Sequence, residues 1–165
     1  SADHSMVYIV STALRKAVEL TQEKGAGWIS SVDDGWKHVM LSPYDYAREA
    51  IFHPETRSLM EKVTFEHGGP EYDKRYPDGI PTSIVVTDTD GKEYDSGMVM
   101  YPTGHARNTD NDLRGILQTK FEMLGNLAMD DPAPVIDKLN NLSNLSAQQI
   151  NDLNNFQIHD RGRFE

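Results

Sequence analysis

The chain has 165 residues, of which 38% are apolar and 25% charged, and its formal net charge is −10. This composition is typical of a globular protein with one ordinary domain, or with one and a half small ones. The negative charge argues against a nucleic-acid or anionic-membrane surface, and no run approaches the ~20 apolar residues that span a bilayer. The absence of cysteine excludes disulfides and thiolate metal sites and fits an intracellular protein. Because the chain starts with Ser1 rather than methionine, we expect a processed or excised piece.

Helical periodicity dominates the first third of the chain. Apolar residues recur at three- and four-residue spacing over residues 1–20, which predicts a helix that Ser1 or Asp3 would cap. The Gly- and Trp-rich stretch 23–43 is interpreted as an ordered excursion, because flexible linkers rarely contain two tryptophans. Two short helices are predicted to follow, each with a proline in its first turn and beginning near residues 42 and 53.

The middle of the chain changes to the two-residue period of strands. Apolar and polar residues alternate over residues 62–67, which predicts a strand. Residues 82–101 contain two strand-like runs around Asp90 and Gly91, and this pair predicts a hairpin because glycine tolerates the positive φ of tight turns. The stretch 68–81 is rich in glycine and proline, so it is predicted to be a loop.

Helical patterns return in the last third. They predict helices within residues 109–128, 130–142 and 146–156, and Ser146 with Gln149 has the spacing of a capping box. Helices, then a small antiparallel sheet, then helices again predict an α+β fold with the sheet layered against helices. Two or three strands make a thin sheet, so we expect further strands outside this chain.

Asp3 and His4 are the first candidate functional residues. They stand at the start of the first predicted helix, where unpaired N–H groups attract anions and a histidine can transfer a proton. The alternative is that Asp3 only caps the helix and His4 is solvated. None of the six histidines has the spacing of a helical metal pair, so no metal site is predicted.

The second candidate is the sequence YPTGHARN, residues 101–108, between a predicted strand and a predicted helix. Gly104 allows an unusual backbone angle or a close approach. His105 and Arg107 alternate, so in an extended loop their side chains share one side, and arginine binds carboxylates in a bidentate manner. The alternative is a simple connection whose arginine pairs with one of the many surface acids.

Three stretches taken together resemble the MmgE/PrpD family. Residues 2–14, ADHSMVYIVSTAL, are similar to a family helix with a D-H-x-x-x-Y pattern, formed here by Asp3, His4 and Tyr8. HPETRSLMEKVTFEH resembles the family's helix-to-strand step. TDTDGKEYDSGMVMYPTGHARNTDNDLRGILQTKF resembles its hairpin, its P-x-G-H loop and the helix that follows, and YPTGHAR is especially similar to the 2-methylcitrate dehydratase branch.

The resemblance implies a hydro-lyase that removes water from 2-methylcitrate to form 2-methyl-cis-aconitate in propionate catabolism, with no cofactor and no iron–sulfur cluster. Other members decarboxylate cis-aconitate or epimerise iminodisuccinate. It further implies that residues 1–108 are a lid-like α+β domain that is incomplete at its N-terminal side. Residues 109–158 are then C-terminal helices that pack on a missing N-terminal helical domain, and residues 159–165 are a tail.

A tricarboxylate substrate gives the candidate residues a use. The resemblance places His4 near the site as a catalytic residue, with Asp3, Gly104, His105 and Arg107 as substrate-binding residues. His105 and Arg107 have a second interpretation, in which they lock the lid to the helical domain, and the principal acid and base residues would lie outside this chain. The fragment is then expected to be inactive alone.

Partners and alternatives follow from the same resemblance. It implies a homodimer without nucleic-acid or membrane partners, in the mitochondrial matrix of a eukaryote or the cytoplasm of a bacterium. A different class of function stays open: a non-catalytic lid or assembly module, or an antigenic fragment. Its motive is the missing N-terminal part and the incomplete sheet.

Overall fold

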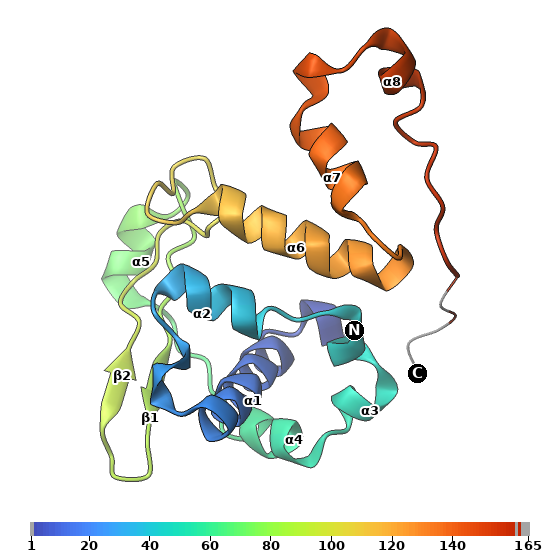
Figure 1. Cartoon of the computed structure of the whole chain (residues 1–165). Helices are drawn as coiled ribbons and strands as arrows, with labels where there is room; N and C mark the ends of the chain where they lie inside the picture. The colour runs from blue at the N-terminus through green and yellow to red at the C-terminus, as the bar shows by residue number, and fades with distance from the viewer. Residues whose placement is uncertain (1, 161, 163–165) are drawn as a thin grey trace. The chain divides into compact units, whose positions relative to one another are not determined.

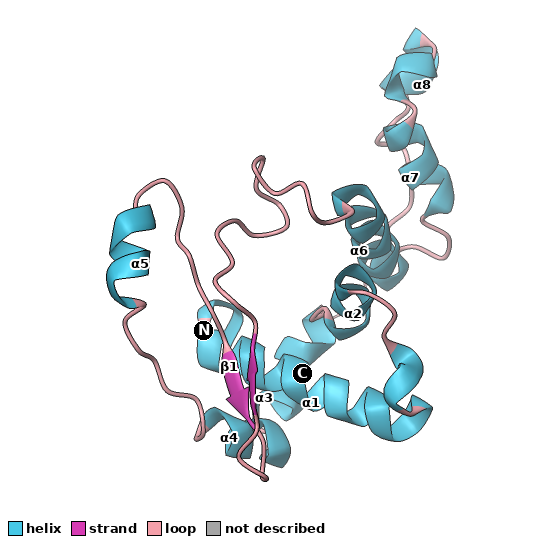
Figure 2. Ribbon diagram, turned by 90° about the vertical axis from the view of Figure 1, so that its left-hand side faces the viewer, coloured by secondary structure: helices cyan, strands magenta, loops and turns pink. Residues whose placement is uncertain are grey.

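The computed structural model describes residues 2–160 and 162. Within them, helices dominate and one two-stranded antiparallel sheet is present, so the predicted α+β class is confirmed (Figures 1 and 2). The α-helices are α1 (Met6–Lys24), α2 (Val32–Val39), α3 (Arg48–Ile51), α4 (Pro54–Met60), α5 (Gly69–Arg75), α6 (Leu113–Ala128), α7 (Ala133–Asn140) and α8 (Ala147–Asn151), and the strands are β1 (Val85–Thr87) and β2 (Glu93–Asp95). Short 3-10 helices cover Ala2–His4, Ala26–Trp28, Pro43–Tyr46 and Leu142–Asn144.

Backbone contacts divide the chain into two compact units. The first unit contains the described residues up to Val63 and from Arg114 onward, and the second contains Thr64–Leu113. The predicted domain boundary at residue 108 concerned packing on a domain outside this chain, so it stays a prediction. Of the predicted tail 159–165, residues 161 and 163–165 lie outside the described residues.

Helix α1 is the longest element of the first unit. It begins at Met6 because the Ser5 hydroxyl accepts a hydrogen bond from the backbone N–H of Tyr8 (3.3 Å), and it ends at Gly25, whose positive φ of 77° favours glycine. The predicted cap at Asp3 is therefore wrong, since residues 2–4 form a separate 3-10 turn. Ser1, the other predicted cap, lies outside the described residues.

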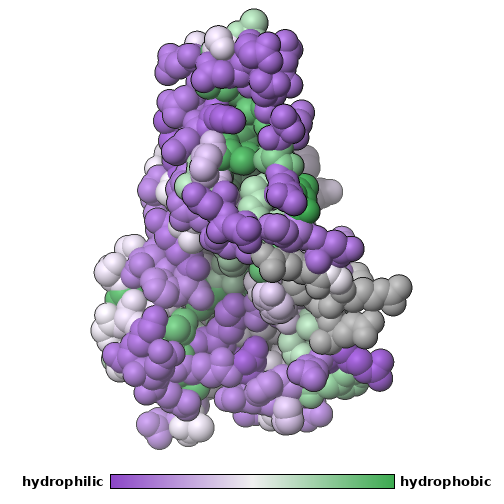
Figure 3. All heavy atoms as spheres, turned by 45° about the vertical axis from the view of Figure 1, so that its right-hand side comes forward, coloured by the Kyte–Doolittle hydropathy of each residue, from purple (hydrophilic) through white to green (hydrophobic). Residues whose placement is uncertain are grey.

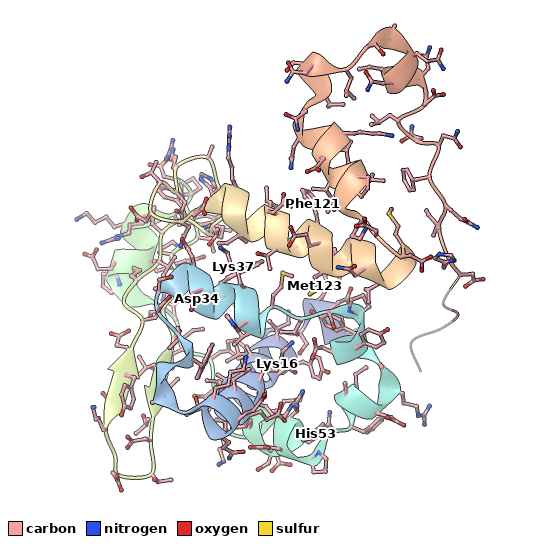
Figure 4. The ribbon with its side chains drawn as sticks, in the orientation of Figure 1. Lys16, Asp34, Lys37, His53, Phe121 and Met123 are labelled. Carbon is pink, nitrogen blue, oxygen red and sulfur yellow. The ribbon has the colours of Figure 1, made fainter. Side chains whose placement is uncertain are left out.

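Polar groups as well as apolar ones are buried where α1 packs on α4. Thr56 of α4 is fully buried and its hydroxyl accepts a hydrogen bond from Arg15 Nε of α1 (2.9 Å). Ser11 and Thr12 are also fully buried, and their hydroxyls have no hydrogen-bond partner among the described residues. Figure 4 labels His53, the residue immediately before α4.

Asp45 is the centre of a hydrogen-bonded cluster that joins α1 to the 3-10 helix Pro43–Tyr46. The Asp45 carboxylate accepts hydrogen bonds from Lys16 Nζ (2.9 Å) and from the Ser42 backbone N–H (2.7 Å), and its backbone carbonyl accepts one from the Tyr8 hydroxyl. Lys16, labelled in Figure 4, also donates to the Met40 carbonyl (2.9 Å). The predicted start near residue 42 is confirmed by a capping box formed by Ser42 and Asp45.

Two further elements of the first unit agree with the sequence predictions. Helix α2 lies within the stretch 23–43, so that excursion is ordered as predicted. Helix α8 begins with the predicted capping box of Ser146 and Gln149. After α8 the chain returns to α6, because the backbone N–H of His159 donates to the carbonyl of Ala128 (2.7 Å) and its ring lies 3.0 Å from Asp130 Oδ2.

The C-terminal helices carry an apolar groove on their surface. Figure 3 shows apolar side chains exposed between polar ones over α7 and α8. A pocket of about 270 Å³ lies between α6, α7 and the chain after α8, and Ile136 on α7 is one of few large apolar side chains buried in the described residues. Its apolar lining is formed by Phe121, Gly125, Met129, Pro132, Val135, Ile136, Leu139, Leu153 and Phe156.

The second unit contains the hairpin and α5. Strands β1 and β2 pair in the register Val85–Asp95, Val86–Tyr94 and Thr87–Glu93, around the predicted turn at Asp90 and Gly91. Two predictions are wrong here. Residues 62–67 form no strand, because among the described residues no segment pairs with them. Residues 69–75 are helical rather than a loop, since proline fits the first turn and Glu71 pairs with Arg75 one turn later (3.1 Å).

No described helix combines the length and apolar content that crossing a membrane requires.

Candidate functional site

The hairpin of the second unit continues into a pocket on the side away from its turn. Beyond the β1–β2 pairing, Thr82 and Val99 exchange two backbone hydrogen bonds of 3.1 and 2.9 Å. This bridge holds together the two chain segments that bound the pocket, 77–82 and 99–105. The pocket has a volume of about 520 Å³, and its lining is Pro77, Asp78, Gly79, Ile80, Thr82, Val99, Met100, Tyr101, Pro102 and His105.

Gly79 allows the two walls to approach each other closely. A Cβ atom built at this position would lie 2.7 Å from Cε and 3.0 Å from the carbonyl oxygen of Met100. Only the methionine side chain could move aside without a shift of the backbone. The absence of a side chain at residue 79 thus places the neighbouring Asp78 beside the segment that leads into Tyr101.

The YPTGHARN loop is folded into two successive turns. The backbone N–H of His105 donates to the Pro102 carbonyl (2.9 Å), and that of Asn108 donates to the His105 carbonyl (2.9 Å). These turns place the His105 ring on the Tyr101 ring, with centroids 4.6 Å apart and an angle of 19° between the planes. The loop is therefore not extended, so the alternation of His105 and Arg107 does not by itself put their side chains on one side.

The Asn108 side chain fastens the end of the loop. Its amide nitrogen donates to the Tyr101 carbonyl (3.0 Å) and to Asn111 Oδ1 (2.9 Å). Its oxygen accepts from the backbone N–H groups of Asp110 (3.1 Å) and Asn111 (3.3 Å). A half-buried asparagine with four hydrogen bonds fixes the loop more firmly than its two turns alone.

Replacing Asn108 with alanine is expected to loosen this loop. The change leaves the Tyr101 carbonyl and two backbone N–H groups without their partner, and we expect roughly tenfold faster amide hydrogen exchange over residues 103–111. The neighbouring Thr109→Ala is the matched control, since Thr109 is exposed and makes no hydrogen bond among the described residues. Equal exchange in both variants would show that Asn108 does not hold the loop.

Arg107 is held against Tyr101 by two contacts. Its NH1 group donates to the Tyr101 hydroxyl (3.0 Å), and its guanidinium carbon lies 5.6 Å from the centre of the tyrosine ring. The hydrogen bond to Tyr101 and the more distant negative charge of Asp78 raise the pKa of the guanidinium above its usual value. Arg107 is exposed, and its other N–H groups have no acceptor among the described residues, so they are available to a carboxylate.

The hydrogen bonding of His105 defines which ring nitrogen carries hydrogen. Its Nδ1 accepts from the backbone N–H of Arg107 (3.1 Å), which requires Nδ1 to be unprotonated. The neutral ring therefore carries its hydrogen on Nε2, a donor with no partner among the described residues. His105 lines the pocket, so it can offer a hydrogen bond there.

Gly104 has neither the unusual backbone angle nor the close approach that its sequence position suggested. Its φ is not positive, and nothing lies within 4 Å of the position that a Cβ would occupy. The interpretation of an unusual backbone angle or a close approach at Gly104 is wrong; Gly79 is the glycine that allows a close approach. A role of Gly104 in substrate binding stays a prediction.

Asp3 and His4 lie in the first unit, in the 3-10 turn that precedes α1. His4 Nδ1 is 3.1 Å from Asp3 Oδ2, and the His4 side chain is 84% exposed. Burial, and after it the charges of Asp3 and Asp45, raise the pKa of the Tyr46 hydroxyl, so Asp3 adds negative charge to a region that already contains Asp45. The structure brings together the two residues of each pair, Asp3 with His4 and His105 with Arg107, but the pairs belong to different units.

The comparison with known families decides where this chain belongs. Residues 37–141, more than half of the chain, match the family model of the MmgE/PrpD C-terminal domain. The chain belongs to the MmgE/PrpD family. No curated protein and no solved structure gives a significant match to it.

Within this MmgE/PrpD chain, the matched range divides the candidate residues. Gly104, His105 and Arg107 lie inside the C-terminal domain, whereas Asp3 and His4 precede it. Among the described residues, no group of three or more His, Cys, Asp or Glu side chains is arranged to hold a metal ion. The roles predicted for all five residues stay predictions, and the pocket beside His105 is the site with the better-defined geometry.

Sequence reasoning missed three residues of this site. Tyr101 was part of the quoted loop but was assigned no role, and its hydroxyl is the partner of Arg107. Asn108 closes the loop, and its position at the end of a Gly-containing turn was a usable signal. Asp78 lies within a stretch predicted to be a loop, and only the folded chain shows that it lines the same pocket as His105.

Proposed function

We propose that this chain is the C-terminal part of a 2-methylcitrate dehydratase, a hydro-lyase, and that the pocket beside the 101–108 loop contacts the tricarboxylate substrate. Family membership supports a dehydratase-like lyase. The observation that carries the proposal to this site is that His105 and Tyr101 line one pocket, and that each has a side-chain donor hydrogen that no described residue accepts. The exposed guanidinium of Arg107 adds a positive charge next to them.

The chemistry of dehydration defines what these residues do. Removal of water beside a carboxylate needs a base for the Cα proton, an acid for the leaving hydroxyl, and positive or hydrogen-donating groups on the carboxylates. In our proposal the Arg107 guanidinium and the His105 Nε2–H supply the last of these. The principal base and acid come from the N-terminal helical domain of the same polypeptide. His4 is the catalytic candidate within this chain.

The test is turnover of 2-methylcitrate by the complete polypeptide that contains this chain, followed by the ultraviolet absorbance of the unsaturated acid. His105→Ala and Arg107→Ala are each expected to lower kcat/KM by about tenfold or more, because each removes a hydrogen bond to a charged group. His67→Ala and Arg75→Ala are matched controls. They remove the same residue types from exposed positions of the same unit that do not line the pocket, and they should leave kcat/KM unchanged.

Other outcomes separate the alternatives. Unchanged turnover in the His105 and Arg107 variants would contradict substrate contact and leave those residues a structural role. Release of carbon dioxide from cis-aconitate would indicate a decarboxylase, and interconversion of iminodisuccinate enantiomers would indicate an epimerase. Turnover by the 165-residue chain alone, abolished by His4→Ala, would contradict our placement of the base and acid outside this chain.

A non-catalytic role is the second candidate, and a separate observation favours it. The described residues bury few large apolar side chains, and the groove between α6 and α7 is lined almost entirely by apolar groups. Such a surface is typical of a piece that packs on another domain or subunit. This candidate predicts self-association of the chain in solution and no turnover in the complete polypeptide, which sedimentation and the same assay would show.

A further inference from the structure

The pocket of the second unit contains one carboxylate, that of Asp78, among its polar side chains. Asp78 lines it together with Tyr101 and His105, and its carboxylate makes no hydrogen bond or ion pair among the described residues. The close approach at Gly79 fixes the position of the Asp78 segment against Met100. The charge of Asp78 acts on Arg107 from a distance, but the pocket still combines an acceptor that makes no hydrogen bond with donor hydrogens that make none among the described residues.

Two residues of the lining, Tyr101 and His105, have donor hydrogens that no described residue accepts. Because the Tyr101 oxygen already accepts a hydrogen bond from Arg107, its own hydrogen is directed elsewhere. Because His105 Nδ1 accepts from the Arg107 backbone, its hydrogen lies on Nε2. Both hydrogens suit a carboxylate of a ligand, whereas Asp78 accepts a hydrogen and would repel a second carboxylate placed against it.

We propose that Asp78 is a specificity-determining residue that accepts a hydrogen bond from the hydroxyl of a hydroxycarboxylate, while Tyr101 and His105 donate to its carboxylate. This inference rests on the proposed function in that it places substrate in the same pocket. It goes further because it explains why the pocket would bind the hydroxyl-bearing substrate more tightly than the unsaturated product. An unsaturated product lacks the hydroxyl and leaves the Asp78 carboxylate facing an anion without a hydrogen bond, so it binds less tightly than the substrate.

The remainder of the pocket agrees with a small ligand that has a hydrocarbon backbone. Ile80, Val99 and Met100 supply apolar surface next to the polar groups, and a volume of about 520 Å³ holds a six- or seven-carbon acid with its water. The Thr82 hydroxyl is already engaged with the Ile80 carbonyl (3.3 Å). The Asp78 carboxylate is an acceptor of this pocket that a ligand hydroxyl can reach without displacing a hydrogen bond between described residues, and it is the one lining acceptor that carries a side-chain charge.

The experiment compares citrate with tricarballylate, which is citrate without its hydroxyl. Both are titrated into the 165-residue chain, and binding is followed by the amide resonances of Gly79 and His105 in two-dimensional spectra. We expect citrate to bind about tenfold more tightly, since one hydrogen bond to a charged group distinguishes the two acids. In Asp78→Ala the affinity for tricarballylate should rise, because a repulsive charge is gone, and the ratio of affinities should fall to about one.

Asp90→Ala is the matched control for charge. It removes the same residue type from another exposed Asp–Gly step of the same unit, in the hairpin turn, and should leave the ratio of affinities unchanged. Tyr101→Phe should weaken both acids equally, because it removes a donor to the carboxylate that they share.

Two results would overturn the inference: equal affinities in the unaltered chain, which include the absence of binding by either acid, or a preference for citrate that survives Asp78→Ala. These results are independent of the proposed function, which the turnover assay reports. Turnover of 2-methylcitrate together with equal affinities for the two acids would support the lyase activity and contradict the role of Asp78. A preference for citrate that depends on Asp78, without turnover, would support the role of Asp78 and contradict the lyase activity.

Discussion

Replacing Tyr8 with alanine is expected to lower the free energy of unfolding of the chain by about 3–5 kcal/mol. Tyr8 is the largest of the fully buried side chains, at 2% exposure, and its ring packs at 6.0 Å from that of Tyr46. Alanine at this position leaves a cavity under the 3-10 helix Pro43–Tyr46. Urea unfolding followed by far-ultraviolet circular dichroism measures the change, and a chain that is already unfolded without urea would agree with it.

A second substitution separates packing from hydrogen bonding. Tyr8→Phe keeps the ring and leaves the Asp45 carbonyl without its donor, so it should cost about 1–3 kcal/mol. Val18→Ala serves as the control, because Val18 lies on the same helix but is 43% exposed, and we expect a loss under about 1 kcal/mol. A Tyr8→Ala loss no larger than that of Val18→Ala would show that Tyr8 is not part of a stable core.

The burial of Tyr8 gives this residue of the D-H-x-x-x-Y pattern a structural role. The D-H-x-x-x-Y pattern suggested a functional helix start, but the structure buries Tyr8 and exposes His4. Tyr8 was not part of the predicted apolar stripe, yet its ring is buried, and a buried tyrosine hydroxyl needs an acceptor. The acceptor is the Asp45 carbonyl, which is 37 residues away in the chain, and no local pattern indicates that pairing.

Elements governed by local rules were predicted well. Ser146 with Gln149 forms the predicted capping box, Ser42 lies at the predicted helix start, and Asp90 with Gly91 turns the predicted hairpin, because these interactions involve residues within one turn of each other. The strand prediction for residues 62–67 was wrong because a strand depends on a partner that can lie far away in the chain. Alternation describes the two faces of an extended segment, but a strand also needs a partner, and none of the described segments pairs with this one.

In the candidate site, too, the features formed by neighbouring residues were predicted and those that depend on distant segments were not. The 101–108 loop was recognised because glycine, histidine and arginine are close in sequence, whereas the wall that contains Asp78 lies more than twenty residues earlier. The bridge between Thr82 and Val99 and the absence of a side chain at Gly79 bring the two walls together. Such an approach depends on the folded hairpin, so composition and spacing could not predict it.

The second large effect concerns Asp45 and its dependence on pH. Burial alone would raise the pKa of this carboxyl, but hydrogen bonds from the Ser42 backbone and from Lys16 outweigh burial and hold the pKa below its usual value. Side chains of Asp45 and Lys16 are 13% and 20% exposed. Asp45→Asn leaves Lys16 with an uncompensated charge in this partly buried position, and we expect a loss of about 2 kcal/mol in the free energy of unfolding at neutral pH.

The sign of the pH dependence follows from the direction of the shift. Because the folded pKa lies below the unfolded value of about 3.9, the stabilisation by Asp45 is complete above that value and disappears as the pH falls through the lower folded pKa. The difference in stability between the unaltered chain and Asp45→Asn should therefore be constant near neutral pH and shrink as the pH falls below the unfolded pKa of about 3.9. Glu71→Gln, which breaks an exposed pair with Arg75, should cost under about 0.5 kcal/mol. A difference for Asp45→Asn that stays constant into acid would mean that the carboxylate charge does not stabilise the first unit, and that Lys16 is held by the Met40 carbonyl alone.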